Sequence, residues 1–458
     1  MHNIKSLDEL LTSRDENLYN TVIEVSNWLE DNEIKDERGL RWKSAPESDT
    51  DYKNVPFLDD KTFYGGSAGI GLFYIRLYLV SKEEKYIYKA IDAANYLIDT
   101  YEEDKDRKEP GFFSSGYYNG PSGQGYFSEI LYQVLKDVGN DASKYHEFAL
   151  KVADDLVDSI RKVDDKASTW THSVAMVSDG SDDLYLLYMY ERTGDQRYLD
   201  TAVSNGYYFI SQAEDAPVGK RWYAMDVTNP AFNFKEKGYF PNFFYGTSGN
   251  AYLLALLYKY TKEEIFLEYA KAGALYIESV AHVKDGTTLI PYNVPNRENI
   301  FYLGMCQGPV GTTRLYRLLY ELTHDSHYSD YVIKLTDGIL ATGAPQIHSP
   351  GYWKTYCYCC GAAGMLELFI QVNHFFNIED YSDAASDAAI TLIGDSFVSD
   401  HKRRWYTQWT RILPKDVEAY TGLFHGSTGC ANALLTLYNE LSEHIELPGF
   451  LEDYWVKG

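Results

Sequence analysis

The chain has 458 residues, of which 45% are hydrophobic and 16% aromatic, so it can bury a large core. Its formal net charge of −25 argues against binding to nucleic acids or to anionic membrane surfaces, because both require a basic footprint. The 5 cysteines, an odd number, do not form the disulfide framework of a small secreted protein.

The N-terminal segment, residues 1–55, is polar and carries one or two amphipathic helices and a charged loop. It lacks the charged-then-apolar pattern of a signal peptide, and no later apolar run is long enough to span a membrane. We therefore expect a cytoplasmic protein without membrane insertion, in a compartment that keeps thiols reduced. We also expect residues 1–55 to pack as a helical segment on a larger domain, residues 56–458.

A glycine turn recurs seven times in residues 56–458, with its first glycine roughly every 50–65 residues. Each turn opens a helical stretch that is apolar on nearly all sides, and a second helix with one polar face follows most of them. Inner helices buried on both sides and outer amphipathic ones, repeated in a closed ring, predict an all-α fold, an α/α toroid or barrel. Because the seventh repeat ends early, the N-terminal helices are expected to supply its outer partner. The turns read Gly66-Ser-Ala-Gly69, Gly120-Pro-Ser-Gly123, Gly180-Ser-Asp-Asp183, Gly246-Thr-Ser-Gly249, Gly308-Pro-Val-Gly311, Gly361-Ala-Ala-Gly364 and Gly426-Ser-Thr-Gly429.

Short aromatic segments precede several inner helices and indicate brief β-hairpins at the mouth of the ring. Examples begin at Gly219, Gly286, Gly351 and Arg403. Most of their tyrosines and tryptophans are expected to pack rather than to bind a ligand.

Four of the five cysteines lie in the fifth and sixth turns: Cys306, Cys357, Cys359 and Cys360. Adjacent cysteines do not easily bridge each other, because a disulfide needs Cα atoms about 5.5–6 Å apart, but both can bind one metal ion. A third thiolate from the fifth turn would complete a zinc site with an open fourth position, as in catalytic sites. The alternative is that small, soft cysteines merely pack against the glycines.

With these turns the chain resembles the lanthionine synthetase C-like (LanC-like) family over about residues 60–440. The likeness rests most on Met-Cys306-Gln-Gly308 and Cys359-Cys360-Gly361. In the second motif the family usually has Cys-His-Gly, and Cys360 in place of the histidine resembles the three-cysteine zinc site that some members carry. The likeness implies a barrel of seven inner and seven outer helices, with zinc (Zn²⁺) at the mouth held by Cys306, Cys359 and Cys360. It also implies a cyclase reaction of lanthipeptide biosynthesis, in which a zinc-bound cysteine thiolate adds to a dehydrated Ser or Thr of a peptide and closes a thioether ring.

The chain departs from the family at the positions of the residues that are expected to transfer protons during the reaction. Tyr245 replaces the histidine before the fourth glycine, and the family's aspartate near the third glycine is matched only by the shifted Asp179. His425 precedes the seventh glycine in the register of Cys360 and Tyr245, so we expect it to face the mouth. His425, Tyr245 and Asp179 are therefore the catalytic candidates.

The role of Cys357 stays open. It lies two residues before Cys359, so on an extended segment both side chains would point the same way. It could exchange with Cys359 as a ligand or simply pack.

Three other functions are compatible with the residues. One is addition or elimination of a small thiol such as glutathione at a dehydrated residue, and another is a catalytically silent, zinc-containing module that binds a peptide. The third is a barrel glycosidase or lyase that uses Asp179, Asp182 or Asp183, which would require carboxylates about 5–10 Å apart and would leave the clustered cysteines without a purpose. No dehydratase-like region is present, so a separate dehydratase is an expected partner alongside the peptide substrate.

Overall fold

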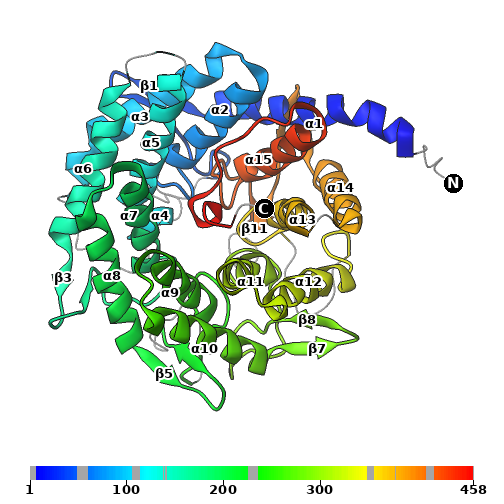
Figure 1. Ribbon diagram of the computed structural model, residues 1–458. Coiled ribbons are helices and arrows are strands. Elements are labelled where there is room, and N and C mark those ends of the chain that lie inside the picture. The colour runs from blue at the N-terminus through cyan, green and yellow to red at the C-terminus, as the bar shows by residue number, and fades with distance from the viewer. Residues whose placement is uncertain are drawn as a thin grey trace.

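The computed structural model describes residues 7–48, 60–105, 114–137, 139, 142–224, 236–347, 355–376, 378–408 and 417–456. Over these residues the chain forms a ring of paired helices (Figure 1), and all of its strands are short. The all-α toroid predicted from the glycine turns is confirmed. None of the described helices combines the length and the hydropathy needed to cross a lipid bilayer.

The inner helices of the described chain are seven, and each begins at one of the turns. They are apolar on nearly all sides because neighbouring inner helices and an outer helix cover them. In the first of them, every residue from Ser67 to Leu77 is buried. The inner helices are α2 (Ser67–Ser81), α5 (Pro121–Asp137), α7 (Asp179–Thr193), α9 (Thr247–Thr261), α11 (Pro309–Thr323), α13 (Ala362–Phe376) and α15 (Ser427–Tyr438).

The outer helices are amphipathic and pack against the inner helix of their own repeat. Two begin at capping aspartates, since Asp195 accepts a hydrogen bond from the Arg197 N–H and Asp325 one from the His327 N–H, both at 3.0 Å. They are α3 (Glu84–Lys105), α6 (Ser143–Ser159), α8 (Gln196–Ser211), α10 (Glu264–Val280), α12 (Ser326–Ala341) and α14 (Glu379–Gly394). Helix α1 (Leu7–Glu30) packs against α15 and so takes the outer position of the seventh repeat. A domain boundary near residue 55 stays a prediction.

The strands pair as two-stranded antiparallel hairpins, five of which pack against an outer helix: β2 on α3, β4 on α8, β6 on α10, β8 on α12 and β10 on α1. The segment Gly351–Lys354, expected to be extended, lies outside the described residues. The pairs are β1 (Glu33–Asp36) with β2 (Gly39–Trp42), β3 (Arg161–Lys162) with β4 (Ser168–Thr169), β5 (Ala213–Asp215) with β6 (Lys220–Trp222), β7 (His282–Lys284) with β8 (Thr287–Leu289), β9 (Phe397–Ser399) with β10 (Lys402–Arg404), and β11 (Thr407–Gln408) with β12 (Val417–Glu418).

The turns are tied to one another by backbone hydrogen bonds at the N-terminal ends of the inner helices. Each bond joins the same position of two turns, the residue two places before the first glycine; Val177 takes this place in the third repeat. This residue donates its N–H to the carbonyl oxygen of the corresponding residue in another repeat. The bonds run Val177 to Phe244 (3.0 Å), Phe244 to Cys306 (2.9 Å), Cys306 to Cys359 (3.1 Å), Cys359 to Phe424 (2.7 Å), Phe424 to Tyr64 (2.8 Å) and Tyr64 to Tyr118 (2.8 Å). This register brings the cysteines of two successive repeats together.

The second glycine of a turn is required by crowding. A Cβ on Gly311 would lie 2.0 Å from the Met305 carbonyl oxygen, and one on Gly364 would lie 2.3 Å from that of Tyr358. Only a residue without a side chain fits at these two positions.

The third repeat is shifted by one residue from the register read in the sequence. Val177 takes the place that Phe244 and Cys306 take in their turns, because its N–H bonds to Phe244 as the N–H of Phe244 bonds to Cys306. Asp179 therefore occupies the position of a first glycine, and Gly180 lies one residue later. The sequence reading Gly180-Ser-Asp-Asp183 was out of register because Gly180 is the nearest glycine to that position.

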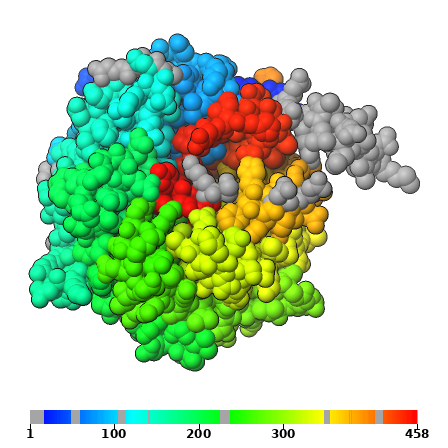
Figure 2. Space-filling model, viewed as in Figure 1, coloured from blue at the N-terminus to red at the C-terminus, as the bar shows by residue number. Residues whose placement is uncertain are grey.

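After the short helix η2 (Asn439–Glu443), the C-terminal residues run to the centre of the ring, where they form the short helix η3 (Leu451–Asp453) (Figures 1 and 2). Asp453 is ion-paired with Arg314 of α11, from Oδ1 to Nε at 2.8 Å. Three inner-helix side chains hold the tail by its carbonyl oxygens: Tyr126 OH donates to Gly449 (2.8 Å), Tyr252 OH to Glu452 (2.9 Å) and Arg317 Nη2 to Val456 (2.8 Å).

Candidate metal centre

Three cysteines predicted as metal ligands lie together at the ends of α11 and α13. The Sγ atoms of Cys306, Cys359 and Cys360 all lie within 4.8 Å of one another, and those of Cys306 and Cys360 are 3.3 Å apart. Cys306 and Cys359 are buried, whereas Cys360 is partly exposed. One ion could therefore be held by all three sulfurs and still be reached from one side.

Gly304 lets the two cysteine turns approach each other this closely. A Cβ there would lie 2.5 Å from the Cys360 Cα and 2.7 Å from the Cys359 carbonyl oxygen. A side chain at position 304 would thus push the sixth turn away from the fifth and separate the sulfurs.

The three thiols do not ionise alike. Burial opposes ionisation of Cys359, but hydrogen bonds from Cys306, Cys360 and the Tyr64 phenol outweigh it and hold the pKa of Cys359 well below its usual range. The pKa values of Cys306 and Cys360 are raised, Cys306 first by its hydrogen bond with Cys359 and Cys360 first by its hydrogen bond with Cys306. Cys359 is therefore the thiol of the three that is most readily ionised, and the hydrogen bonds from Cys306, Cys360 and Tyr64 stabilise its thiolate.

Cys357 and Cys430 lie outside the group of three sulfurs. Cys357 Sγ is 3.4 Å from Thr355 Oγ1, and its thiol also has a hydrogen bond with Cys360. Cys430 Sγ donates to the Tyr356 carbonyl oxygen at 3.3 Å. An exchange of Cys357 with Cys359 as a ligand stays a prediction.

His425 is buried among aromatic rings. Its imidazole stacks on Tyr64, with ring centroids 5.2 Å apart and planes inclined by 13°, and its second neighbour is Tyr420 at 4.9 Å. Burial lowers the pKa of His425 to about 3, so the imidazole is neutral near pH 7.

Tyr245 lies on the side of the cluster formed by the fourth repeat. Its ring meets Phe240 and Phe244 edge-on, with centroids 5.7 and 6.3 Å away. Burial, and then the negative charge of Cys306 and Cys359, raise the pKa of its phenol well above the usual value. Tyr245 is therefore a hydrogen-bond donor rather than a base.

Asp179 is fully buried and both of its oxygens accept hydrogen bonds. Oδ2 accepts from Thr169 Oγ1 (2.7 Å), Trp170 N–H (3.0 Å) and Thr171 N–H (3.2 Å), and Oδ1 from Thr171 Oγ1 (2.5 Å) and Ser178 Oγ (3.2 Å). Such bonds anchor the strand β4 to the start of α7. A catalytic role for Asp179 stays a prediction.

The neighbouring acids Asp182 and Asp183 are also buried. Asp182 accepts hydrogen bonds from Ser122 Oγ and the Gly116 N–H, and burial raises its pKa to about 7. Burial likewise raises the pKa of Asp183 well above its usual value. A pair of accessible carboxylates, which the glycosidase alternative needs, is therefore not found at these positions.

Tyr64 was missed in the sequence, although its phenol is hydrogen-bonded to Cys359. One signal could have found it. Tyr64 stands two residues before the first glycine of its turn, the position that Cys306 and Cys359 occupy in theirs.

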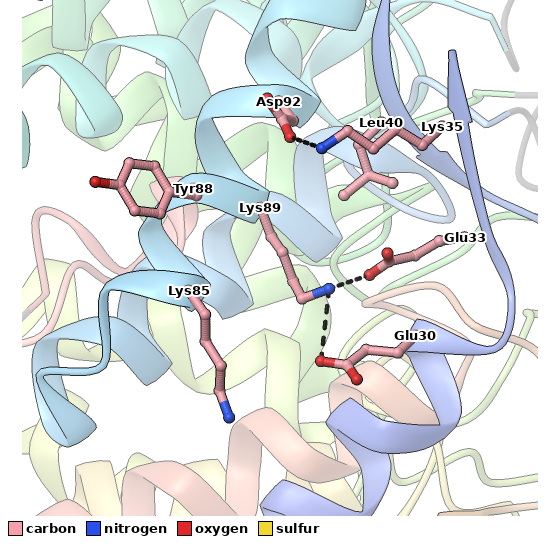
Figure 3. A pocket seen from close by; sticks show the side chains of 8 residues that line it. All are labelled: Glu30, Glu33, Lys35, Leu40, Lys85, Tyr88, Lys89 and Asp92. Atoms are coloured by element: carbon pink, nitrogen blue, oxygen red, sulfur yellow. Dashed lines mark hydrogen bonds and ion pairs between the residues drawn. The ribbon is translucent and has the colours of Figure 1, made fainter.

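A surface pocket lies away from the cysteines, between α1, the β1–β2 hairpin and α3 (Figure 3). Five of its charged residues pair with one another: Lys89 Nζ lies 2.5 Å from Glu33 Oε1 and 3.5 Å from Glu30 Oε1, and Lys35 Nζ lies 2.6 Å from Asp92 Oδ2. The sixth, Lys85, pairs with Glu83 outside the pocket at 2.9 Å. The pocket is lined by Glu30, Glu33, Lys35, Leu40, Lys85, Tyr88, Lys89 and Asp92.

Residues 58–168 and 184–451 match the family model described as lanthionine synthetase C-like protein, and the chain therefore belongs to this family. The gap between the two matched stretches contains Asp179 and the shifted turn of the third repeat. No curated protein matches the chain.

Among solved structures, the fold is similar to that of nisin cyclase, with a TM-score of 0.61, 13% sequence identity, and coverage of 97% of this chain and 98% of that one. An inactive variant of an α-1,6-mannanase of Salegentibacter sp. has a TM-score of 0.45 at 13% identity, covering 93% and 98% of the two chains. A D-mannose isomerase has a TM-score of 0.43 at 16% identity, covering 71% and 86%.

Proposed function

We propose that the chain is a zinc-dependent enzyme that adds a cysteine thiolate to a dehydrated Ser or Thr residue of a peptide and so forms a thioether, or lanthionine. The observation that carries the proposal is the group of three sulfurs, Cys306, Cys359 and Cys360, within 4.8 Å of one another. Family membership and the fold of nisin cyclase support the same reaction class.

The three thiols suit zinc. Zn–S bonds of about 2.3 Å place tetrahedral ligand sulfurs about 3.8 Å apart, and the sulfurs here span 3.3 Å to at most 4.8 Å. Three protein ligands leave the fourth position for a substrate thiol, on the side where Cys360 is exposed. When bound, zinc lowers the pKa of a thiol and keeps it as a nucleophilic thiolate.

The chain's own residues must then move one proton. In our proposal the sulfur of the substrate thiol bonds to the β-carbon of the dehydrated residue while its proton passes to the His425 imidazole, and the double-bond electrons move toward the neighbouring carbonyl. Because burial lowers the pKa of His425 to about 3, the imidazolium holds this proton only transiently and returns it to the α-carbon, so no atom is lost or gained. Tyr245 donates a hydrogen bond to the substrate carbonyl, which carries the developing charge.

Replacing His425 by Asn is expected to lower turnover at least about tenfold, because a positioned acid or base contributes about 10²–10⁴-fold. Tyr245→Phe is expected to have the smaller effect. Turnover is followed as loss of free thiol from a dehydrated, cysteine-containing peptide. Zinc content should remain that of the parent in both variants, since neither residue is a proposed ligand. Equal turnover of His425→Asn and the parent would discard the acid/base role.

Two further candidates share the metal site. The aromatic packing around His425 and the replacement of the family's histidine by Tyr245 favour a catalytically silent, zinc-containing module that binds a peptide. The other candidate adds or removes a glutathione-type thiol at the dehydrated residue. In each case we place the protein in the cytoplasm, with a separate dehydratase supplying the modified peptide.

A further inference from the structure

Tyr64 is held beside the cysteine turns by its backbone. Its N–H donates to the Tyr118 carbonyl and its own carbonyl accepts from the Phe424 N–H, both at 2.8 Å. Phe424 in turn accepts from the Cys359 N–H at 2.7 Å, so the turns of repeats one, seven and six are connected in sequence. The position of Tyr64 relative to Cys359 is therefore fixed by the backbone hydrogen bonds that connect the repeats of the toroid.

The side chain of Tyr64 is 6% exposed and bridges two groups of the site. One face of its ring stacks on His425, at 5.2 Å and 13°, and the ring also stacks on Phe424, at 5.3 Å and 26°. Its phenol oxygen has a hydrogen bond with Cys359. Because a cysteine that binds a metal ion carries no proton, the phenol is the donor in this hydrogen bond when Cys359 is a ligand.

We propose that Tyr64 is a positioning residue of the metal centre, which donates a hydrogen bond to the Cys359 sulfur and holds the His425 imidazole parallel to its own ring. This inference rests on the proposed function in one respect, that Cys359 is a metal ligand. Groups that hydrogen-bond to metal ligands orient them and tune the metal, and their loss typically lowers metal affinity about 10–100-fold. A donor on Cys359 also withdraws electron density from that sulfur, which leaves the incoming substrate thiolate as the more reactive one.

The test uses the full chain with Co²⁺ in place of zinc, because sulfur-to-cobalt charge-transfer bands report on each ligand sulfur. Tyr64→Phe removes only the phenol oxygen. We expect it to bind one Co²⁺ per chain at saturation, to move the charge-transfer band to lower energy and to weaken affinity about tenfold. Tyr64→His keeps an aromatic ring with an N–H donor and is expected to bring the band back toward that of the parent.

Tyr74→Phe is the matched control. Tyr74 is a fully buried tyrosine of the same repeat, and its hydroxyl accepts a hydrogen bond from Ser26 Oγ at 3.5 Å. This variant therefore tests the effect of removing a buried tyrosine hydroxyl that is not bonded to a cysteine. Its spectrum should match that of the parent.

The outcomes separate this inference from the proposed function. A parent protein that takes up no Co²⁺ would contradict the three-cysteine ligand set, and with it the role of Tyr64. A parent that binds Co²⁺ and a Tyr64→Phe protein with the same band and the same affinity would overturn only the role of Tyr64. If Tyr64→Phe does not fold, Tyr64→Leu, which also lacks a donor, takes its place: a band at lower energy than that of the parent supports the donor, and an unchanged band overturns it.

Discussion

Replacing Cys359 by Ala is expected to reduce bound zinc to about a tenth of an ion per chain or less, because two thiolates leave the cation without enough ligands. The same loss is expected for Cys306→Ala and Cys360→Ala, since the three sulfurs lie within 4.8 Å of one another. Elemental analysis of the purified variants measures the effect directly.

Cys430→Ala is the control for loss of a buried thiol. Cys430 is buried and bonds to the Tyr356 carbonyl, outside the group of three, so this variant should keep a full zinc ion. Full zinc in Cys360→Ala would refute the ligand set and point to Cys357, which has a hydrogen bond with Cys360.

Asp453→Ala is expected to destabilise the fold by about 3–5 kcal/mol, the usual cost of leaving a buried charge without its partner. Asp453 pairs with Arg314 through Nε at 2.8 Å and Nη2 at 2.9 Å, and its Oδ1 lies 3.7 Å from Arg317 Nη2. Both arginine side chains are almost fully buried, so water cannot replace the carboxylate. The free energy of unfolding in urea measures the change.

The control removes an exposed ion pair. Asp165 pairs with Lys162 at 3.2 Å on the surface, and its loss should cost less than about 1 kcal/mol. If Asp453→Ala were no less stable than Asp165→Ala, the C-terminal residues would not hold the ring together.

The sequence was sufficient to predict the inner helices, because each combines a turn glycine with a stretch that is apolar on all sides. Gly311 and Gly364 show why that signal is dependable, since a Cβ at either would overlap a backbone carbonyl. The third turn was read one residue out of register because Asp179 occupies a position that six other turns give to glycine. The place of the C-terminal tail could not be predicted, because the Asp453 and Arg314 pair depends on how the ring closes.

The residues of the site that belong to a sequence motif could be predicted, and the others could not. Cys306, Cys359 and Cys360 follow from the cysteine turns, and the structure brings their sulfurs together. Tyr64 belongs to a turn without cysteine, and its contact with Cys359 exists only because the ring joins the first repeat to the seventh.

The central claim is tested most directly by mass spectrometry of a dehydrated, cysteine-containing peptide after incubation with the zinc-loaded protein. Thioether formation within the peptide leaves its mass unchanged but removes the thiol that an alkylating reagent would label. Our account predicts an unlabelled peptide of unchanged mass with the parent and a labelled one with Cys359→Ala. A peptide that gains the mass of glutathione when that thiol is supplied would instead indicate addition of a small thiol. If several such peptides stay fully labelled with the zinc-loaded parent, the claim that the protein catalyses thioether formation is contradicted. The remaining candidate is then the catalytically silent, zinc-containing module that binds a peptide.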